Sequence, residues 1–223
     1  MKEVIKAVSL ISGGIDSPVA SYLALKNNID VVFLHFDNGL FYDNKEVEKV
    51  KKIVSLFSKK FKKKFKICIC NFETFHQRII EKEIRKYHCL ICKRTIFRLA
   101  EKIALNENAD FLLSGENLSQ VASQTKSNLK VIDSAVSFFV LRPLLVYDKE
   151  EIIRMAKEIG TYEISIIKTK GCSAVPKNPA TKSDLNLIKR EEERLGINEI
   201  INELLNNIKI IEIKCSNIEN KES

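Results

Sequence analysis

The sequence predicts an α/β fold with three layers, in which a mostly parallel β-sheet lies between helices on both faces. Apolar runs of strand length alternate with amphipathic helical patterns along most of the chain. Neither an internal repeat nor a Gly/Pro/Ser-rich linker divides the sequence. A chain of 223 residues is long enough for one sizeable domain of this class.

The first half of the chain alternates between strand and helix patterns. Residues 4–11 and 30–36 are apolar runs that predict buried strands, with a tight turn and a helical pattern at 17–26 between them. Residues 44–61 carry apolar side chains at steps of three and four, which predicts an amphipathic helix. Residues 65–70 alternate as a short strand does.

The second half continues this alternation. Helical patterns are expected at 74–85, 90–106 and 149–159, the last ending at Gly160, and strands at 110–114 and 137–142. Residues 169–182 form a Gly/Pro-containing loop in this prediction. We expect residues 1–182 to form the main domain. Residues 183–223 are predicted to be a helical extension packed on that domain, with a final strand at 208–213.

Composition limits the classes of protein that fit. Hydrophobic residues at 45% and charged residues at 30% are typical of a soluble globular chain. The formal net charge of +8 favours contact with polyanions. No signal peptide or membrane-spanning run is recognisable, so we expect a cytoplasmic protein without a membrane partner. In that compartment the six cysteines are expected to be thiols, ligands or catalysts rather than disulfides.

A phosphate-binding turn is predicted between the first strand and the first helix, at Ser12-Gly13-Gly14-Ile15-Asp16-Ser17. Two adjacent glycines allow the backbone N–H groups to approach phosphate oxygens closely. The helix that follows directs its unpaired N–H groups and positive dipole end at the same anion. The two serines add hydroxyl donors, and Asp16 is suited to hold Mg²⁺ or to orient the turn. An ordinary capped turn is the alternative.

This turn resembles the PP-loop of the ATP pyrophosphatases, which cleave ATP to AMP and pyrophosphate to adenylate a carbonyl oxygen. Longer strings narrow the resemblance to the catalytic domain of the ThiI family of tRNA 4-thiouridine synthetases. Those strings are SGGIDSPVA (12–20), SGENLSQVASQT (114–125), LRPLLVYDKEEI (141–152) and CSAVPKNPATK (172–182). The similarity covers nearly the whole chain up to Lys182.

The resemblance implies a set of nucleotide contacts. They are Leu10, Ile11, Ser12, Gly13, Gly14, Asp16, Ser17, His35, Phe36, Lys93, Gly115 and Gln124. Arg142 and Lys149 are further candidates for contacts with phosphate or with the tRNA backbone. Ordinary structural roles are the alternatives, with His35 as a core histidine and Lys149 as part of a solvated helix start.

Three cysteines are candidates for sulfur chemistry. Cys172 corresponds to the family's sulfur-handling cysteine and, with Asp16, is the expected catalytic residue; lysines nearby would favour its thiolate. Cys89 and Cys92 form a CxxC pair at the start of a helix. Such a pair can form a redox disulfide, hold zinc, supply two cluster ligands or simply pack. Together with Cys172, as in archaeal relatives, the pair is expected to hold a 4Fe–4S cluster.

The resemblance implies ATP and Mg²⁺ as cofactors, tRNA as substrate, and sulfide or a persulfide as sulfur donor. RNA-binding domains precede the PP-loop domain in the family, whereas here the turn begins at Ser12. We therefore expect a separate THUMP-like RNA-binding protein, and a homodimer by analogy. The lysine-rich run 58–66 is a candidate track for tRNA phosphates.

The predicted function is therefore ATP-dependent thiolation of a tRNA uridine at its 4-carbonyl. One alternative is a PP-loop enzyme that thiolates another nucleobase or supplies sulfur for the thiamine thiazole. Another is an amide-forming ligase, which would not need Cys172. A third, from a different class, is a nucleotide-binding subunit without turnover.

Overall fold

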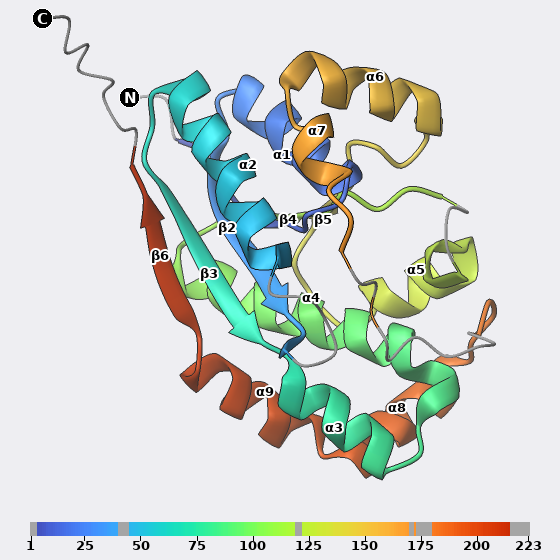
Figure 1. Cartoon of the computed structure of the whole chain (residues 1–223). Helices are drawn as coiled ribbons and strands as arrows, with labels where there is room; N and C mark the ends of the chain where they lie inside the picture. Colours follow the sequence, from blue (N-terminus) through green and yellow to red (C-terminus); the bar gives the residue numbers. More distant parts are fainter. Residues whose placement is uncertain (1–3, 40–44, 119–121, 170–171, 173–179, 215–223) are drawn as a thin grey trace, which may run out of the picture.

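A six-stranded sheet in the order β5-β4-β1-β2-β3-β6 forms the centre of the molecule (Figure 1). The computed structural model describes residues 4–39, 45–118, 122–169, 172 and 180–214. The strands are β1 (Lys6–Leu10), β2 (Asp30–Asp37), β3 (Phe65–Asn71), β4 (Phe111–Leu113), β5 (Val140–Leu141) and β6 (Lys209–Ile213). The first five pair in parallel, and β6 runs antiparallel to β3. The predicted mostly parallel sheet is confirmed.

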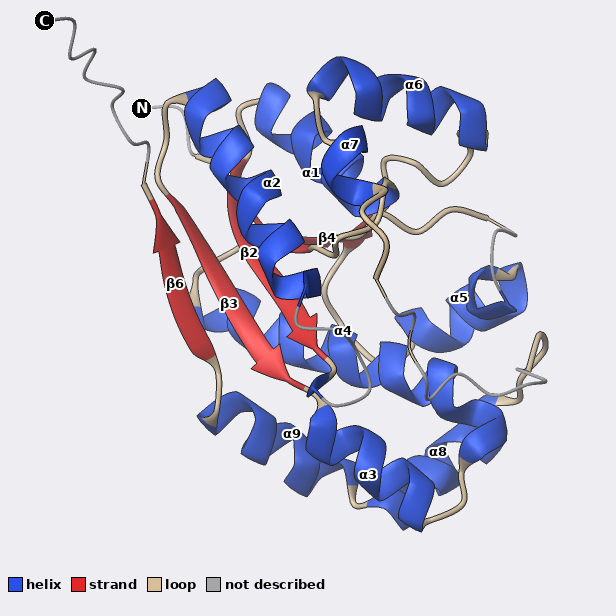
Figure 2. Ribbon diagram, viewed as in Figure 1, coloured by secondary structure: helices blue, strands red, loops and turns tan. Residues whose placement is uncertain are grey.

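Helices cover both faces of this sheet, which gives the predicted three layers (Figure 2). One layer holds α1 (Asp16–Lys26), α2 (Lys45–Phe61), α6 (Lys149–Ile159) and α7 (Tyr162–Ser165). The other holds α3 (Glu73–Glu81), α4 (His88–Asn106), α5 (Lys126–Asp133), α8 (Leu185–Leu195) and α9 (Ile197–Asn206). Each layer has its own core because strand side chains alternate between the faces: Ala7 and Phe33 enter one core, and Val8 and Leu34 the other.

Several element limits follow from local chemistry. Helix α6 begins at a capping box between Asp148 and Glu151 and ends at Gly160, whose φ is +90°. The helix expected at 74–85 stops at Glu81, and Glu83 beyond it has a φ of +56°. The strand expected at 137–142 is only two residues long, because just Val140 and Leu141 pair with β4.

Two helices, α5 and α7, were not among the predicted elements. Helix α5 had a recognisable start signal, because the side chain of Thr125 caps it by accepting from the backbone N–H of Asn128. The expected loop at 169–182 lies mostly outside the described residues. No helix in the described part of the chain has the length and apolar character needed to cross a membrane.

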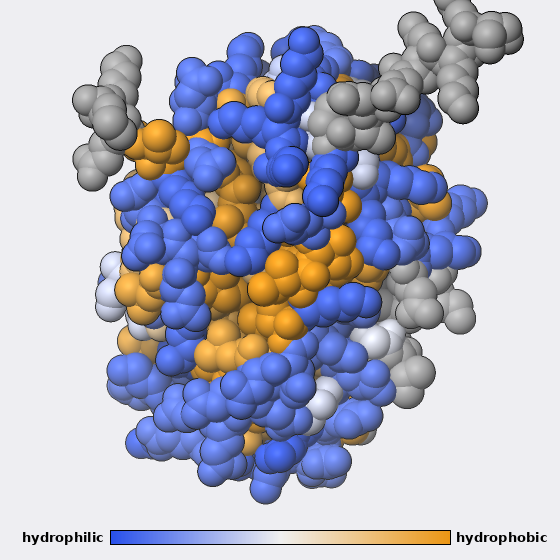
Figure 3. Space-filling view, turned by 90° about the vertical axis from the view of Figure 1, so that its left-hand side faces the viewer, coloured by the Kyte–Doolittle hydropathy of each residue, from blue (hydrophilic) through white to orange (hydrophobic). Residues whose placement is uncertain are grey.

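The C-terminal extension packs against the same sheet and helices. Helices α8 and α9 contribute to the core that contains α3 and α4. Glu192 on α8 is buried and bonded to Arg94 and Arg98 on α4, with its closest oxygen 2.7 Å from each side chain. Strand β6 forms one edge of the sheet. It lies on the left-hand side of the molecule in Figure 1, and apolar residues gather in the middle of the surface on that side (Figure 3). The division at residue 182 stays a prediction.

Candidate active site

A cleft of about 600 Å³ opens at the carboxyl ends of the parallel strands. This is the edge at which ligands bind in open α/β sheets. The structure brings most of the predicted site residues together there. Those lining the cleft are Leu10, Ile11, Ser12, Gly14, Asp16, Ser17, His35, Phe36, Cys89, Cys92, Lys93, Gly115, Gln124 and Cys172. Gly13, Arg142 and Lys149 stand behind or beside this lining.

The predicted phosphate turn is held by its own hydroxyl groups. Ser17 Oγ accepts from the backbone N–H of Ser12 at 2.8 Å, and the two serine Oγ atoms lie 3.0 Å apart. Ser165 Oγ on α7 donates to the carbonyl of Gly14 at 3.1 Å. Lys149 Nζ, at the start of α6, pairs with Asp16 Oδ1 at 2.7 Å. A helix N-terminus with hydroxyl donors and a neighbouring cation is well suited to an anion.

Two glycines of the site lie where a Cβ would meet neighbouring atoms, backbone at one position and side chains at the other. A Cβ on Gly115 would lie 2.6 Å from both Cα and N of Ser17. The loop after β4 therefore packs directly on the backbone at the start of α1. A Cβ on Gly13 would contact the side chains of Glu46 and Lys49, which α2 places behind the turn. Gly13 thus has a packing role, although it does not line the cleft.

His35 is a buried neutral imidazole at the end of β2. Its Nδ1 donates to the carbonyl of Ile11 at 3.0 Å, so its Nε2 carries a lone pair. Burial lowers the pKa of His35, against smaller opposing effects of the Ile11 hydrogen bond and nearby carboxylates. Within the described part of the chain, Nε2 is buried without a hydrogen-bond partner. A buried acceptor at a cleft wall is suited to a ligand donor.

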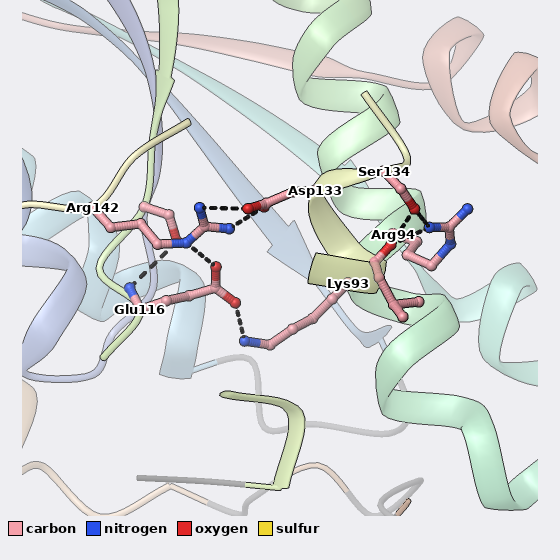
Figure 4. A network of polar contacts seen from close by, with 8 residues as sticks. Lys93, Arg94, Glu116, Asp133, Ser134 and Arg142 are labelled. Carbon is pink, nitrogen blue, oxygen red and sulfur yellow. Dashed lines mark hydrogen bonds and ion pairs between the residues drawn. The ribbon is translucent and has the colours of Figure 1, made fainter. Parts of the chain in front are cut away.

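An ion-pair network forms the wall next to β4 and β5 (Figure 4). Glu116 lies between Lys93 at 2.5 Å and Arg142 at 2.9 Å, and Arg142 also pairs with Asp133 at 2.5 Å. Burial alone would raise the pKa of Glu116, but the two cations outweigh it and lower that pKa. The Arg142 guanidinium lies 5.6 Å from the ring centroid of Phe97. Arg142 is thus positioned to hold Glu116, which in turn holds Lys93 at the cleft.

Helix α4 also lines the cleft, through a single face. Cys89, Cys92, Lys93, Ile96 and Phe97 all line the cleft. Their spacing of three and four residues places them on one side of a helix. The CxxC pair and the cleft lysine therefore project into the same space.

Cys89, Cys92 and Cys172 are not part of a disulfide in the described part of the chain. Burial raises the pKa of Cys89 and of Cys92, and the nearby Cys172 raises both further. Cys172 itself is half-buried and lines the cleft, whereas the lysines expected beside it lie outside the described residues. Among the residues that the structure describes, no group of three or more His, Cys, Asp or Glu side chains could hold a metal ion. The three thiols share one cleft without forming a ready-made metal site.

The prediction omitted several residues of the cleft, including Glu46, Glu116, Asn38 and His76. Asn38 Oδ1 accepts from His76 Nε2 at 2.6 Å, so His76 Nδ1 accepts from His88 Nε2 at 2.7 Å. Burial lowers the pKa of His76 to about 3, with a further contribution from His88. His76 is hence neutral, and it orients the Asn38 amide. No local string announces such a relay, because its members come from three separate elements.

Comparison with known proteins agrees with the resemblance carried by the motifs. The sequence model of the family described as thiamine biosynthesis protein (ThiI) matches residues 4–197. A probable tRNA sulfurtransferase of Moorella thermoacetica is 36% identical over 211 residues, which are 94% of this chain and 54% of that protein. One of Methanocaldococcus jannaschii is 38% identical over 196 residues, which are 86% of this chain and 50% of that protein.

Solved structures give the same result. A 4-thiouridine synthetase in complex with RNA and bound ATP has a TM-score of 0.89 and 38% identity, covering 94% of this chain and 55% of that one. NMN synthetase from Francisella tularensis, with a TM-score of 0.53 and 13% identity over 92% of this chain and 85% of its own, shares the fold alone. The chain spans about half the length of the curated relatives it matches. Because the family model covers most of its residues, the chain belongs to the ThiI family.

Proposed function

We propose that this chain carries the catalytic centre of an ATP-dependent tRNA sulfurtransferase that converts a uridine to 4-thiouridine. The observation that carries the proposal is the meeting of the phosphate turn and three thiols in one cleft. Relatives described as tRNA sulfurtransferases, and a similar 4-thiouridine synthetase with bound ATP and RNA, support the same assignment.

In this proposal, ATP phosphates bind at residues 12–17, with Lys93 and Lys149 as further cationic contacts. The uridine 4-oxygen attacks the α-phosphorus of ATP, N3–H gives up its proton, and pyrophosphate leaves. Hydrosulfide then attacks C4, and AMP departs with the former carbonyl oxygen. With a persulfide on Cys172 instead, attack on C4 leaves a disulfide between Cys172 and the base. The thiol of Cys89 or Cys92, which line the same cleft, would then attack Cys172 Sγ, which releases 4-thiouridine and forms a Cys–Cys disulfide that an external dithiol reduces. The chain contributes mainly positioning and charge stabilisation. Asp16 is the proposed Mg²⁺ contact, through the carboxylate that Lys149 now holds.

In addition to ATP and Mg²⁺, we propose a 4Fe–4S cluster held by Cys89, Cys92 and Cys172. Its support is that all three thiols line one cleft. Since the described residues present no preformed set of metal ligands, the thiols would have to move closer together around a cluster. Iron and acid-labile sulfide analysis of protein purified without oxygen tests this, with Cys89→Ser as the control. Cluster loss in the variant supports the proposal, whereas iron-free protein after reconstitution contradicts it. Zinc, or no metal, is then the alternative.

A sulfur donor and two protein partners complete the proposal. The sulfur donor is sulfide or a persulfide, and a THUMP-like RNA-binding protein and a second copy of this chain are proposed partners. The family description also names thiamine biosynthesis, which favours sulfur supply for a thiazole as the second candidate function. It would use the same cleft with a different acceptor.

The test supplies the protein with ATP, Mg²⁺, sulfide and unmodified tRNA, and measures AMP, pyrophosphate and 4-thiouridine. We expect all three products, and a Cys172→Ala variant should lose 4-thiouridine. ATP consumption without sulfur in tRNA would contradict the acceptor. An amide ligase would keep its activity in the Cys172→Ala variant, and a non-catalytic subunit would release no pyrophosphate.

A further inference from the structure

A groove lined by lysines runs along the outer side of α2, away from the cleft. It has a volume of about 820 Å³ and is lined by Lys51, Lys52, Lys59 and Lys60, with the end of α6 at Ile159 on its other side. Lys62, Lys63 and Lys64 follow directly on α2 and are exposed. We call these seven side chains the α2 lysine surface.

The positive charge of this surface is only slightly neutralised. Glu48 pairs with Lys51 at 2.6 Å and is the one carboxylate in the groove lining. Within the described part of the chain, the other six ammonium groups form no ion pair with a carboxylate. Lys60 bonds instead to the carbonyl of Ile159 at 3.3 Å and lies over the ring of Tyr22. The surface is therefore strongly cationic, which favours a polyanion as its ligand.

The arrangement of the charges is linear. Lys52 and Lys59 are seven residues apart, so they lie on the same side of α2 and are separated by about 10 Å along its axis. Glu46, at the other end of the same helix, lines the cleft. At 1.5 Å per residue, the path from Glu46 to Lys59 is about 20 Å long. A mononucleotide cannot span this path, whereas a nucleic acid strand carries regularly spaced charges over that distance.

We propose that the α2 lysine surface binds the phosphate backbone of the RNA whose uridine enters the cleft. This inference rests on the proposed function for the identity of the RNA. The lysines contact phosphates and sugars only, so they position the substrate and carry no base specificity. They touch neither ATP nor the reacting atoms, and their loss should weaken RNA binding without changing the chemical step.

The test is a salt series of tRNA binding, measured by fluorescence anisotropy of a labelled tRNA transcript between 50 and 200 mM KCl. The variant changes Lys52, Lys59, Lys62 and Lys64 to Gln. The matched control changes four exposed lysines elsewhere to Gln. They are Lys82 at the end of α3, Lys102 on α4, Lys189 on α8 and Lys209 on β6. Both variants lower the net charge by the same amount.

Log K for tRNA binding decreases with log[salt], so the slope is negative. We expect the magnitude of this slope to become smaller in the variant, by about 0.7–0.9 for each phosphate that a lysine no longer neutralises and by about 3 in total. Affinity should drop more than tenfold, while the control changes less than twofold and ATP affinity is unchanged in both. Equal losses in the two variants, no loss in either, or no RNA binding by the wild type would overturn the surface.

The thiolation assay separates this inference from the proposed function. An α2 variant with a raised KM for tRNA and an unchanged kcat supports the surface. Normal 4-thiouridine formation with an unchanged KM overturns the surface and leaves the function intact. RNA binding through these lysines without any thiolation would contradict the function and leave the surface intact.

Discussion

Replacing Glu192 by glutamine removes a buried carboxylate that two arginines of α4 share. Glu192 Oε1 accepts from Arg94 Nε at 2.7 Å and from Arg98 Nη1 at 2.9 Å. Glu192 Oε2 accepts from Nη2 of the same arginines at 3.1 and 2.7 Å. The Arg94 side chain is only 1% exposed, whereas that of Arg98 is 21% exposed. The variant therefore leaves one guanidinium charge buried and uncompensated.

The expected loss of stability is about 3–5 kcal/mol, the range for breaking a buried ion pair. Arg94 keeps its bonds to the carbonyl of Val131 and to Ser134 Oγ, which favours the lower half of that range. For a chain of this size, such a loss lowers Tm by about 6–20 °C. Urea unfolding followed by circular dichroism measures it as a lower midpoint with an unchanged m value.

A matched control lies next to it on α8. Glu191 pairs with Arg194 at 2.6 Å in a partly exposed i,i+3 pair, so Glu191→Gln should lose no more than about 1 kcal/mol. A double variant, Arg94→Met with Glu192→Leu, removes the buried charge together with its partner and should recover much of the loss. A Glu192→Gln loss below about 1 kcal/mol, or no recovery in the double variant, would refute the reasoning.

Glu192 should also make the free energy of unfolding depend on pH. Burial would raise the pKa of Glu192, but the two arginines outweigh it and lower that pKa in the folded state. A depressed carboxyl pKa stabilises the fold above the unfolded value of about 4.3, and this stabilisation is lost as pH falls through that value and below. The difference in unfolding free energy between wild type and Glu192→Gln should therefore shrink between pH 6 and pH 3.

Three further predictions concern the cleft and the core. Gly115→Ala should weaken nucleotide binding more than tenfold in calorimetry, because its Cβ would lie 2.6 Å from the Ser17 backbone; unchanged affinity would show that the loop can move. Glu116→Gln should lose about 1–3 kcal/mol in urea unfolding, less than the Glu192 variant, since Asp133 still pairs with Arg142; an equal loss would contradict this ranking. Burial raises the pKa of Cys70 to about 12, so iodoacetamide at pH 8 should label it only after unfolding.

Much of the fold could be predicted because the alternation of strands and helices in α/β proteins follows from the periodicity of apolar residues. The central residues of the first two strands, Ala7, Val8 and 31–34, are buried against both helix layers, which explains why these runs are mostly apolar. The limits of a strand were predicted less well where they depend on pairing with another strand. The run at 137–142 has strand character throughout, but β4 pairs with only Val140 and Leu141. Pairing partners are long-range, so the length of β5 is invisible in its own residues.

In the site, too, local features could be predicted and long-range pairings could not. The glycines and serines of the phosphate turn could be located because that chemistry requires adjacent residues in a fixed order. The pairing of Glu116 with Lys93 and Arg142 could not, since these residues are 23 and 26 positions apart and only the fold brings them together. Arg142 was a candidate contact for phosphate or the tRNA backbone, and this stays a prediction; in the structure its guanidinium pairs with two carboxylates.

Helix α4 connects the cleft with the buried ion pair to α8. One side of it carries the CxxC pair and Lys93 into the cleft. Arg94, the next residue, faces the other way and is fixed to α8 through Glu192. A helix held by a buried bidentate pair on one side cannot easily rotate on the other, so the distance between the thiols and the phosphate turn depends on α8. Loss of Glu192 should therefore weaken nucleotide binding as well as stability, even though Glu192 contacts α4 on the side away from the cleft.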